Sequence, residues 1–150
     1  MTSQLSQIKW GRVLLTGLAV SVLSFLLVFV IVTGYATYLA FQARGAPDQA
    51  MIQAFANQYA PWIGPISLIL FTFLGAMRMA RRVENAVGLH GLLVGVFAGL
   101  VNLIFDGLSL SALTITVLTV AAGWLGSRLK APRTTPVSYT HLTLPTIYSV

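Results

Sequence analysis

The feature that most constrains this chain is an apolar run that begins at Val13 and meets no charged residue before Arg44. A bilayer core of about 30 Å is crossed by about 20 helical residues, so this run is long enough to span a membrane. Further apolar runs of spanning length follow at about 62–79, 87–105 and 108–125. Because 57% of the 150 residues are hydrophobic and only 8% are charged, the chain lacks the polar surface of a soluble domain.

The first run, taken as 13–39, is predicted to be a retained helix rather than a cleaved secretory signal. Lys9 and Arg12 precede it as they would a signal, but the apolar region of a signal has only about 7–15 residues. The sequence therefore predicts an all-α fold in which one domain, 13–130, is a bundle of four transmembrane helices after a cytoplasmic N-terminus, 1–12. Cysteine is absent, so disulfides and thiolate metal sites do not arise.

Basic residues are divided unequally between the two ends of the predicted helices, and short cytoplasmic loops are enriched in Lys and Arg. The N-terminus, the second connection and the C-terminal end carry eight basic residues, whereas the other two connections carry only Arg44. We therefore expect both termini to be cytoplasmic. The eight are Lys9, Arg12, Arg78, Arg81, Arg82, Arg128, Lys130 and Arg133. Aromatic residues that favour the interfaces agree with this orientation, namely Trp10 and Trp124 inside and Tyr35, Tyr38, Tyr59 and Trp62 outside.

The first connection, RGAPDQAMIQAFANQYAPW, predicts a short amphipathic helix on the outer face of the membrane. Pro47 and Asp48 suit the start of a helix. Met51, Phe55 and Tyr59 recur at four-residue spacing and form one apolar stripe. This helix is interpreted as a lid over the bundle, and the alternative is a surface that docks a partner.

The second and third connections are short and differ in charge. The second contains Arg78, Arg81 and Arg82, which we interpret as an orientation anchor with snorkelling side chains. The alternative is a contact with the phosphate of a lipid headgroup. The third consists of Asp106 and Gly107 alone, so the helices on either side of it must be antiparallel neighbours.

Gly91, Gly95 and Gly99 lie four residues apart and therefore share one face of the third helix. Small residues allow close helix contact in lipid, where no hydrophobic effect drives helices together. A glycine-zipper packing face is the favoured interpretation, and a pore lining is the alternative. The expected counterparts are small residues of the other helices: Gly17, Ser21, Gly75, Ala76, Gly123 and Gly126.

Few polar residues lie within the predicted spans. If the third helix crosses the bilayer in 19 residues, Asp106 lies at the outer interface, where it would end one helix and help Ser109 to cap the next. Asn102, one turn deeper, is expected to bond a neighbouring helix or to line an outer vestibule with Asp106. His90 is a lone residue near the inner interface, and a metal site would need ligands that the sequence does not offer.

Several functional classes have no support in the sequence. Catalytic sets such as Ser-His-Asp, paired carboxylates, a phosphate loop or H-E-x-x-H are missing, so no enzyme activity and no cofactor are expected. The net charge of +6 is explained by orientation and by attraction to anionic lipid, and nucleic acid is not an expected partner.

The segments GAMRMARR (75–82) and GLHGLLVGVFAG (88–99) together resemble an uncharacterised family of small four-helix bacterial membrane proteins. The shared pattern is a helix end rich in small residues, an Ala-Arg pair, a short polar turn and a His-Gly-x-x-x-Gly helix. The resemblance covers about residues 10–130. It implies a multi-pass protein of the bacterial inner membrane and carries no activity with it.

The last fifteen residues, PVSYTHLTLPTIYSV, differ from the rest of the chain. Written back into codons, VSYTHLTLPT resembles a transposon-based sequencing adapter read in frame. We therefore expect 131–150 to be a disordered tail and 136–150 to be foreign to the protein, so this segment is excluded from fold reasoning.

Two functions are consistent with these features. The first is a non-enzymatic assembly or interaction protein, packed through the glycine face or the outer amphipathic helix, with membrane lipids and a second copy or another membrane protein as partners. The alternative is a small oligomeric transporter or channel with an outer vestibule at Asn102 and Asp106.

Overall fold

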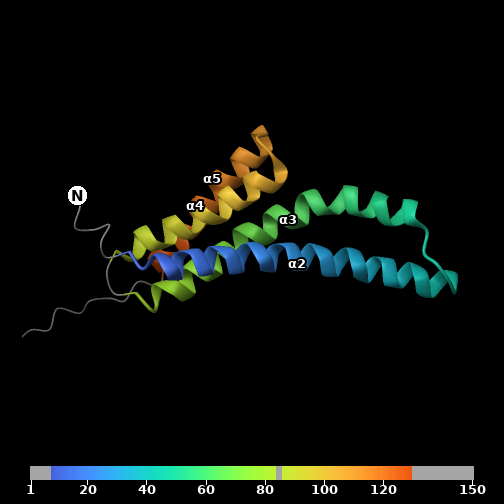
Figure 1. The fold of residues 1–150 in the computed structure, drawn as a ribbon, viewed down its shortest axis with the longest axis horizontal. Coiled ribbons are helices and arrows are strands. Elements are labelled where there is room, and N and C mark those ends of the chain that lie inside the picture. The colour runs from blue at the N-terminus through green and yellow to red at the C-terminus, as the bar shows by residue number, and fades with distance from the viewer. Residues whose placement is uncertain (1–7, 84–85, 130–150) are drawn as a thin grey trace, which may run out of the picture.

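A computed structural model describes residues 8–83 and 86–129 of the chain. The described residues form an all-helical structure (Figure 1), in which every helix is long and apolar enough to cross a membrane. The helices are α2 (Trp10–Ala43), α3 (Gln49–Ala80), α4 (Val87–Asp106) and α5 (Leu110–Leu129). The sequence therefore predicted the fold class and the existence of the four long helices correctly.

The helices form two hairpins of unequal length. At 1.5 Å per residue, α2 and α3 are about 50 Å long, whereas α4 and α5 are about 30 Å long. All four helices meet at the end where α2 begins, and the α4–α5 hairpin leaves the α2–α3 hairpin at an angle (Figure 1). Beyond this meeting point, the outer half of the α2–α3 hairpin is covered by no other described helix.

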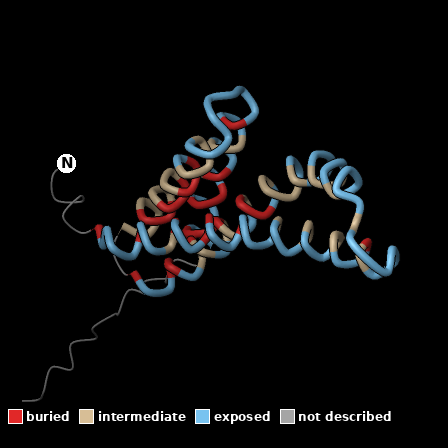
Figure 2. Tube along the Cα trace, turned by 45° about the vertical axis from the view of Figure 1, so that its right-hand side comes forward, coloured by how far each residue is buried: buried red, intermediate tan, exposed pale blue. Residues whose placement is uncertain are grey.

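Burial follows this arrangement. Buried residues gather where the four helices meet, and the outer half of the α2–α3 hairpin is mostly exposed (Figure 2). One apolar cluster contains Val13, Met79 and Val94, and a second contains Val20 and Leu68 together with Ala98. Large apolar side chains such as Phe29 and Phe41 are exposed, which is stable only where lipid covers them.

The three glycines of α4 lie against α5 of the same chain. A Cβ added to Gly95 would lie 2.7 Å from the Val120 Cα and 2.8 Å from the Thr119 carbonyl oxygen. A Cβ on Gly91 would collide with Gly123 and Ser127 of α5, and one on Gly99 would lie 2.6 Å from the Thr116 side chain. The backbones of α4 and α5 therefore approach as closely as the absence of side chains permits.

Among the small residues expected opposite this face, only Gly123 takes that position. Gly126 lies instead against the backbone of Phe73 in α3, and Gly75 lies against Val20 and Thr16 of α2. Gly17 does meet α4, but through the Phe97 side chain and not through the glycines. Small residues thus mark four separate helix contacts, and the hydroxyl residues Thr116, Thr119 and Ser127 complete the α4–α5 contact.

One expectation about the second helix is wrong. Residues 49–60 do not form a separate helix but continue into the span as a single helix, α3. Asp48 caps its start, where the side chain accepts a hydrogen bond of 2.8 Å from the Ala50 backbone N–H. Stacking of Phe55 on Tyr35, with ring centroids 4.0 Å apart, holds the first part of α3 against α2.

His90 links the beginnings of two helices at the end where the four helices meet. Its ring is 1% exposed, and its Nε2 accepts a hydrogen bond of 3.1 Å from the Lys9 backbone N–H. Because that nitrogen must accept, the proton lies on Nδ1, which donates to the Ala86 carbonyl over 2.9 Å. Ala86 is in the left-handed region at φ 51°, and its carbonyl also accepts from the His90 backbone N–H. His90 therefore fixes the turn that leads into α4.

The glycine contact gives a direct test of the packing. Gly95→Ala should lower the free energy of unfolding by about 1–3 kcal/mol, because the new Cβ meets backbone that cannot move aside. Gly34→Ala is the matched control, since a Cβ there meets nothing within 4 Å and should stabilise helix α2 by up to about 1 kcal/mol. Unfolding in mixed micelles, followed by circular dichroism, measures both. Equal effects of the two variants would contradict the close α4–α5 contact.

Candidate functional site

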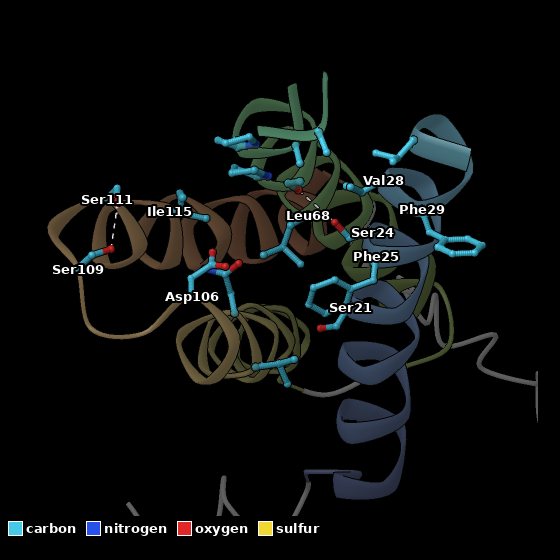
Figure 3. Close-up of a pocket in the computed structure, with 18 of the residues that line it drawn as sticks. Ser21, Ser24, Phe25, Val28, Phe29, Leu68, Asp106, Ser109, Ser111 and Ile115 are labelled. Atoms are coloured by element: carbon cyan, nitrogen blue, oxygen red, sulfur yellow. Dashed lines mark hydrogen bonds between the residues drawn. The ribbon is translucent and has the colours of Figure 1, made fainter. Parts of the chain in front are cut away.

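A large hollow lies where the two hairpins separate. It has a volume of about 820 Å³ and is lined by residues from all four helices. We call it the hairpin cavity. Figure 3 shows the Asp106 side chain directed into the space between α4, α5 and the α2–α3 hairpin. The polar residues that line it are Ser21, Ser24, Asn57, Asn102, Asp106, Ser109 and Ser111.

Asp106 is the only charged residue among those that line the cavity. It is the last residue of α4, and Gly107 follows with φ 73°, a left-handed value that suits glycine and turns the chain toward α5. Ser109 caps α5, where its Oγ accepts a hydrogen bond of 3.1 Å from the Ala112 backbone N–H. None of the hydrogen bonds within residues 8–83 and 86–129 involves the Asp106 carboxylate, so Asp106 does not share in the capping expected of it.

Asn102 precedes Asp106 by four residues and therefore shares its face of α4. Its side-chain amide nitrogen Nδ2 is buried and has no hydrogen-bond partner among the described residues. A buried donor without a partner costs about 1–3 kcal/mol. The same cavity is thus lined by an amide donor and a carboxylate acceptor that have no hydrogen-bond partners among the described residues.

The α3 wall of the cavity contains an irregular stretch of helix. Proline has no N–H, so Pro61 and Pro65 leave the carbonyls of Asn57 and Pro61, four residues earlier, without their usual intrahelical donors. Asn57, Pro61 and Pro65 all line the cavity, and Gly64 lies between the prolines. This wall combines backbone acceptors with the Asn57 side chain.

Hydroxyl groups support the helix at this point. Ser67 Oγ donates to the Gly64 carbonyl over 2.8 Å, and Ser24 Oγ from α2 donates to the same carbonyl over 3.1 Å. The two hydroxyls also lie 2.6 Å apart. Polar groups of α2 and α3 are therefore hydrogen-bonded to each other beside the cavity. Such bonds are expected where a neighbouring helix satisfies backbone groups that proline leaves free in a membrane helix.

The cavity lies beside the middle of α2 and not at its end. Phe105, next to Asp106, makes an edge contact with Phe25 at 4.9 Å between ring centroids. Ten residues, or about 15 Å of helix, separate Phe25 from Tyr35 in the outer aromatic set. The end of α4 therefore lies beside the middle of α2, where the two hairpins separate at an angle.

The predicted arginine set is only partly brought together. Arg78 and Arg82 line a second hollow between α2 and α3, whereas Arg81 does not line it. Arg12 of α2 joins them and donates a hydrogen bond of 3.0 Å from Nη1 to the Arg82 carbonyl. Sequence reasoning assigned Arg12 only to orientation, although its position near the start of the first span was a signal that it would meet the end of the second.

Metal-ligating side chains do not gather in the part of the chain that the structure describes. No group of three His, Cys, Asp or Glu residues there is arranged to hold a metal ion. The chemistry of the hairpin cavity is therefore that of one carboxylate, two amides, hydroxyls and backbone carbonyls.

Two substitutions that remove polar groups from the cavity wall should have opposite effects on stability. Asn102→Leu should leave the free energy of unfolding unchanged or raise it, because the buried amide nitrogen has no protein partner to lose. Ser24→Ala should lower it by about 1 kcal/mol, because the hydroxyl bonds both Gly64 and Ser67. Unfolding in mixed micelles measures both. A clear loss of stability in Asn102→Leu would contradict the assignment of Asn102 as a residue not needed for folding.

Comparisons with protein-family models, with curated proteins and with solved structures found no match to this chain.

Proposed function

We propose that this chain is a small integral membrane protein that binds a small cation in the hairpin cavity, which serves as the outer vestibule of a transport path. The observation that carries the proposal is the pair of Asp106 and Asn102 in a cavity of about 820 Å³, with the Asn102 amide nitrogen buried and without a protein partner. Ionisable groups within membrane proteins are costly, and they concentrate on ion and substrate pathways.

The sign of the charge favours a cation over an anion. Asp106 is the one charged residue in the lining, and no basic residue accompanies it. Side-chain oxygens of Asn102 and Asn57 and the carbonyls released by Pro61 and Pro65 would add neutral oxygen ligands. Carboxylate and carbonyl oxygens together are what membrane proteins use to replace the hydration shell of a cation.

The proposed setting is the bacterial inner membrane, with both termini in the cytoplasm. The eight basic residues in the N-terminus, the second connection and the C-terminal segment of the sequence support this orientation. The four helices that are long and apolar enough to cross a membrane support a membrane location. In this orientation the hairpin cavity opens toward the outer side, and the arginines face the cytoplasm.

An assembly role is the second candidate, and the exposed outer half of the α2–α3 hairpin favours it. The glycine face of α4 is covered by α5, so a second copy could use that face only if α4 and α5 separated. Phe29, Val30 and Phe41 are each more than half exposed along α2 and offer an apolar surface to another membrane protein. In this role the protein would act through contacts and without catalysis.

Ion flux into vesicles that contain the full chain tests the transport proposal. Asp106→Asn should lower cation flux by about tenfold or more, which corresponds to about 1.4 kcal/mol of lost cation binding. Asn102→Ala should lower it as well. Sodium, potassium and proton indicators measure the flux, and chloride flux shows the selectivity between cations and anions.

Asp48→Asn is the matched control for Asp106→Asn. Asp48 is the other carboxylate of the described residues, it does not line the cavity, and asparagine also caps helices. The control should keep parental flux. Vesicles that stay sealed to all three cations with folded parent protein, or equal flux in the Asp106 and Asp48 variants, would overturn the proposal.

A further inference from the structure

A second hollow, lined by other residues than the hairpin cavity, runs along the seam between α2 and α3. Its volume is about 590 Å³, and we call it the arginine groove. Its lining divides into a basic end and an apolar stretch. The basic end is Arg12, Arg78 and Arg82, and the apolar stretch includes Leu15, Ala19, Leu23, Phe71 and Leu74.

The basic end gathers three arginines from the two sides of the seam. Arg78 lies in the last turn of α3 and Arg82 in the turn that follows the helix, and both line the groove. The hydrogen bond from Arg12 to the Arg82 carbonyl holds the third side chain against the end of α3. No acidic residue lines the groove among the described residues. The groove end is therefore strongly positive and suits an anion with several oxygens, such as a phosphate.

The apolar stretch has the length of one leaflet. Arg12 and Leu23 are eleven residues apart on α2, which corresponds to about 16 Å along that helix. Half of a bilayer core is about 15 Å. Leu15, Leu23 and Leu74 are each at least 42% exposed, so an acyl chain can lie directly on them.

We propose that the arginine groove is a binding site for an anionic phospholipid of the leaflet on the Arg12 side. Arg12, Arg78 and Arg82 hold the phosphate, and one acyl chain lies along the apolar stretch between α2 and α3. The groove joins a basic end of three arginines to an apolar stretch as long as one leaflet. This combination fits a lipid and not a free anion, because a free anion would contact only the basic end. The inference does not rest on the proposed cation transport, because the two hollows have no lining residue in common.

Arg81 allows a specific lipid site in the groove to be distinguished from general attraction between a basic surface and anionic lipid. It belongs to the same basic connection and carries the same charge, yet it does not line the groove. Attraction of the surface as a whole to anionic lipid would use Arg81 as much as Arg82. Lipid binding at a specific site in the groove depends on Arg82 and not on Arg81.

Lipid retention by the full chain, measured by native mass spectrometry after purification in detergent, tests the site. The probe is phosphatidylglycerol, with phosphatidylcholine as the zwitterionic comparison. Each of Arg12→Gln, Arg78→Gln and Arg82→Gln should weaken phosphatidylglycerol binding about fivefold, as expected for one basic residue facing anionic lipid. Arg81→Gln should leave binding unchanged. Circular dichroism and size-exclusion chromatography establish that each variant is folded.

A substitution in the apolar stretch tests the acyl chain separately from the headgroup. Ala19→Phe fills the groove without a change of charge and should weaken phosphatidylglycerol binding by a similar factor. Three outcomes would overturn the proposal. These are equal losses in Arg81→Gln and Arg82→Gln, unchanged lipid retention in Ala19→Phe, and full displacement of the lipid by millimolar inorganic phosphate, which would identify a site for free anions.

Discussion

The backbones of α4 and α5 meet at Gly95 so closely that a single Cβ would lie 2.7 Å from the Val120 Cα. In lipid the hydrophobic effect does not hold helices together, so contacts of this kind supply the attraction. They make α4 and α5 one rigid hairpin of about 30 Å. A second backbone contact, between Gly126 and Phe73, joins this hairpin to α3 near the end where all four helices meet. The hairpin cavity exists because this attachment is at one end and leaves the other end of the α4–α5 hairpin apart from α3.

Helix α2 takes part in both proposed sites through neighbouring stretches. Ser21, Ser24 and Phe25 line the hairpin cavity, and Ala19 and Leu23 line the arginine groove. The two hollows therefore share a helix wall only one turn apart. A lipid in the groove would pack on the back of the helix that carries the serines of the cavity, which gives bound lipid a direct physical route to the shape of the cation site. The charged groups of the two hollows lie at different points along α2. The arginines lie near the start of this helix, and Asp106 lies beside its middle.

Much of the helical framework could be predicted from the sequence, because an apolar run of about 20 residues has few alternatives to a membrane helix. The cap at Ser109 was predictable for a similar reason, since its chemistry is local. The position of Asp106 was not. Length gives the number of residues that can cross a bilayer but not the angle at which they cross, and that angle is set by contacts with other helices. The continuity of α3 was missed because the apolar run begins only at about residue 62, whereas the helix extends through Pro61 and Pro65 into the more polar stretch before it.

The composition of the cavity wall argues against a bundle built for packing alone. Such a bundle would place apolar or mutually bonded side chains at positions 102 and 106, as it does at Ser24 and Ser67, whose hydroxyls bond each other and the Gly64 carbonyl. Asn102 instead holds a buried amide nitrogen without a protein partner, one turn from a carboxylate that takes no part in the hydrogen bonds of the described residues. Unsatisfied polar groups in a native structure call for an explanation outside the fold itself. A hydrated cation supplies one, because it neutralises the carboxylate while its water accepts from the amide.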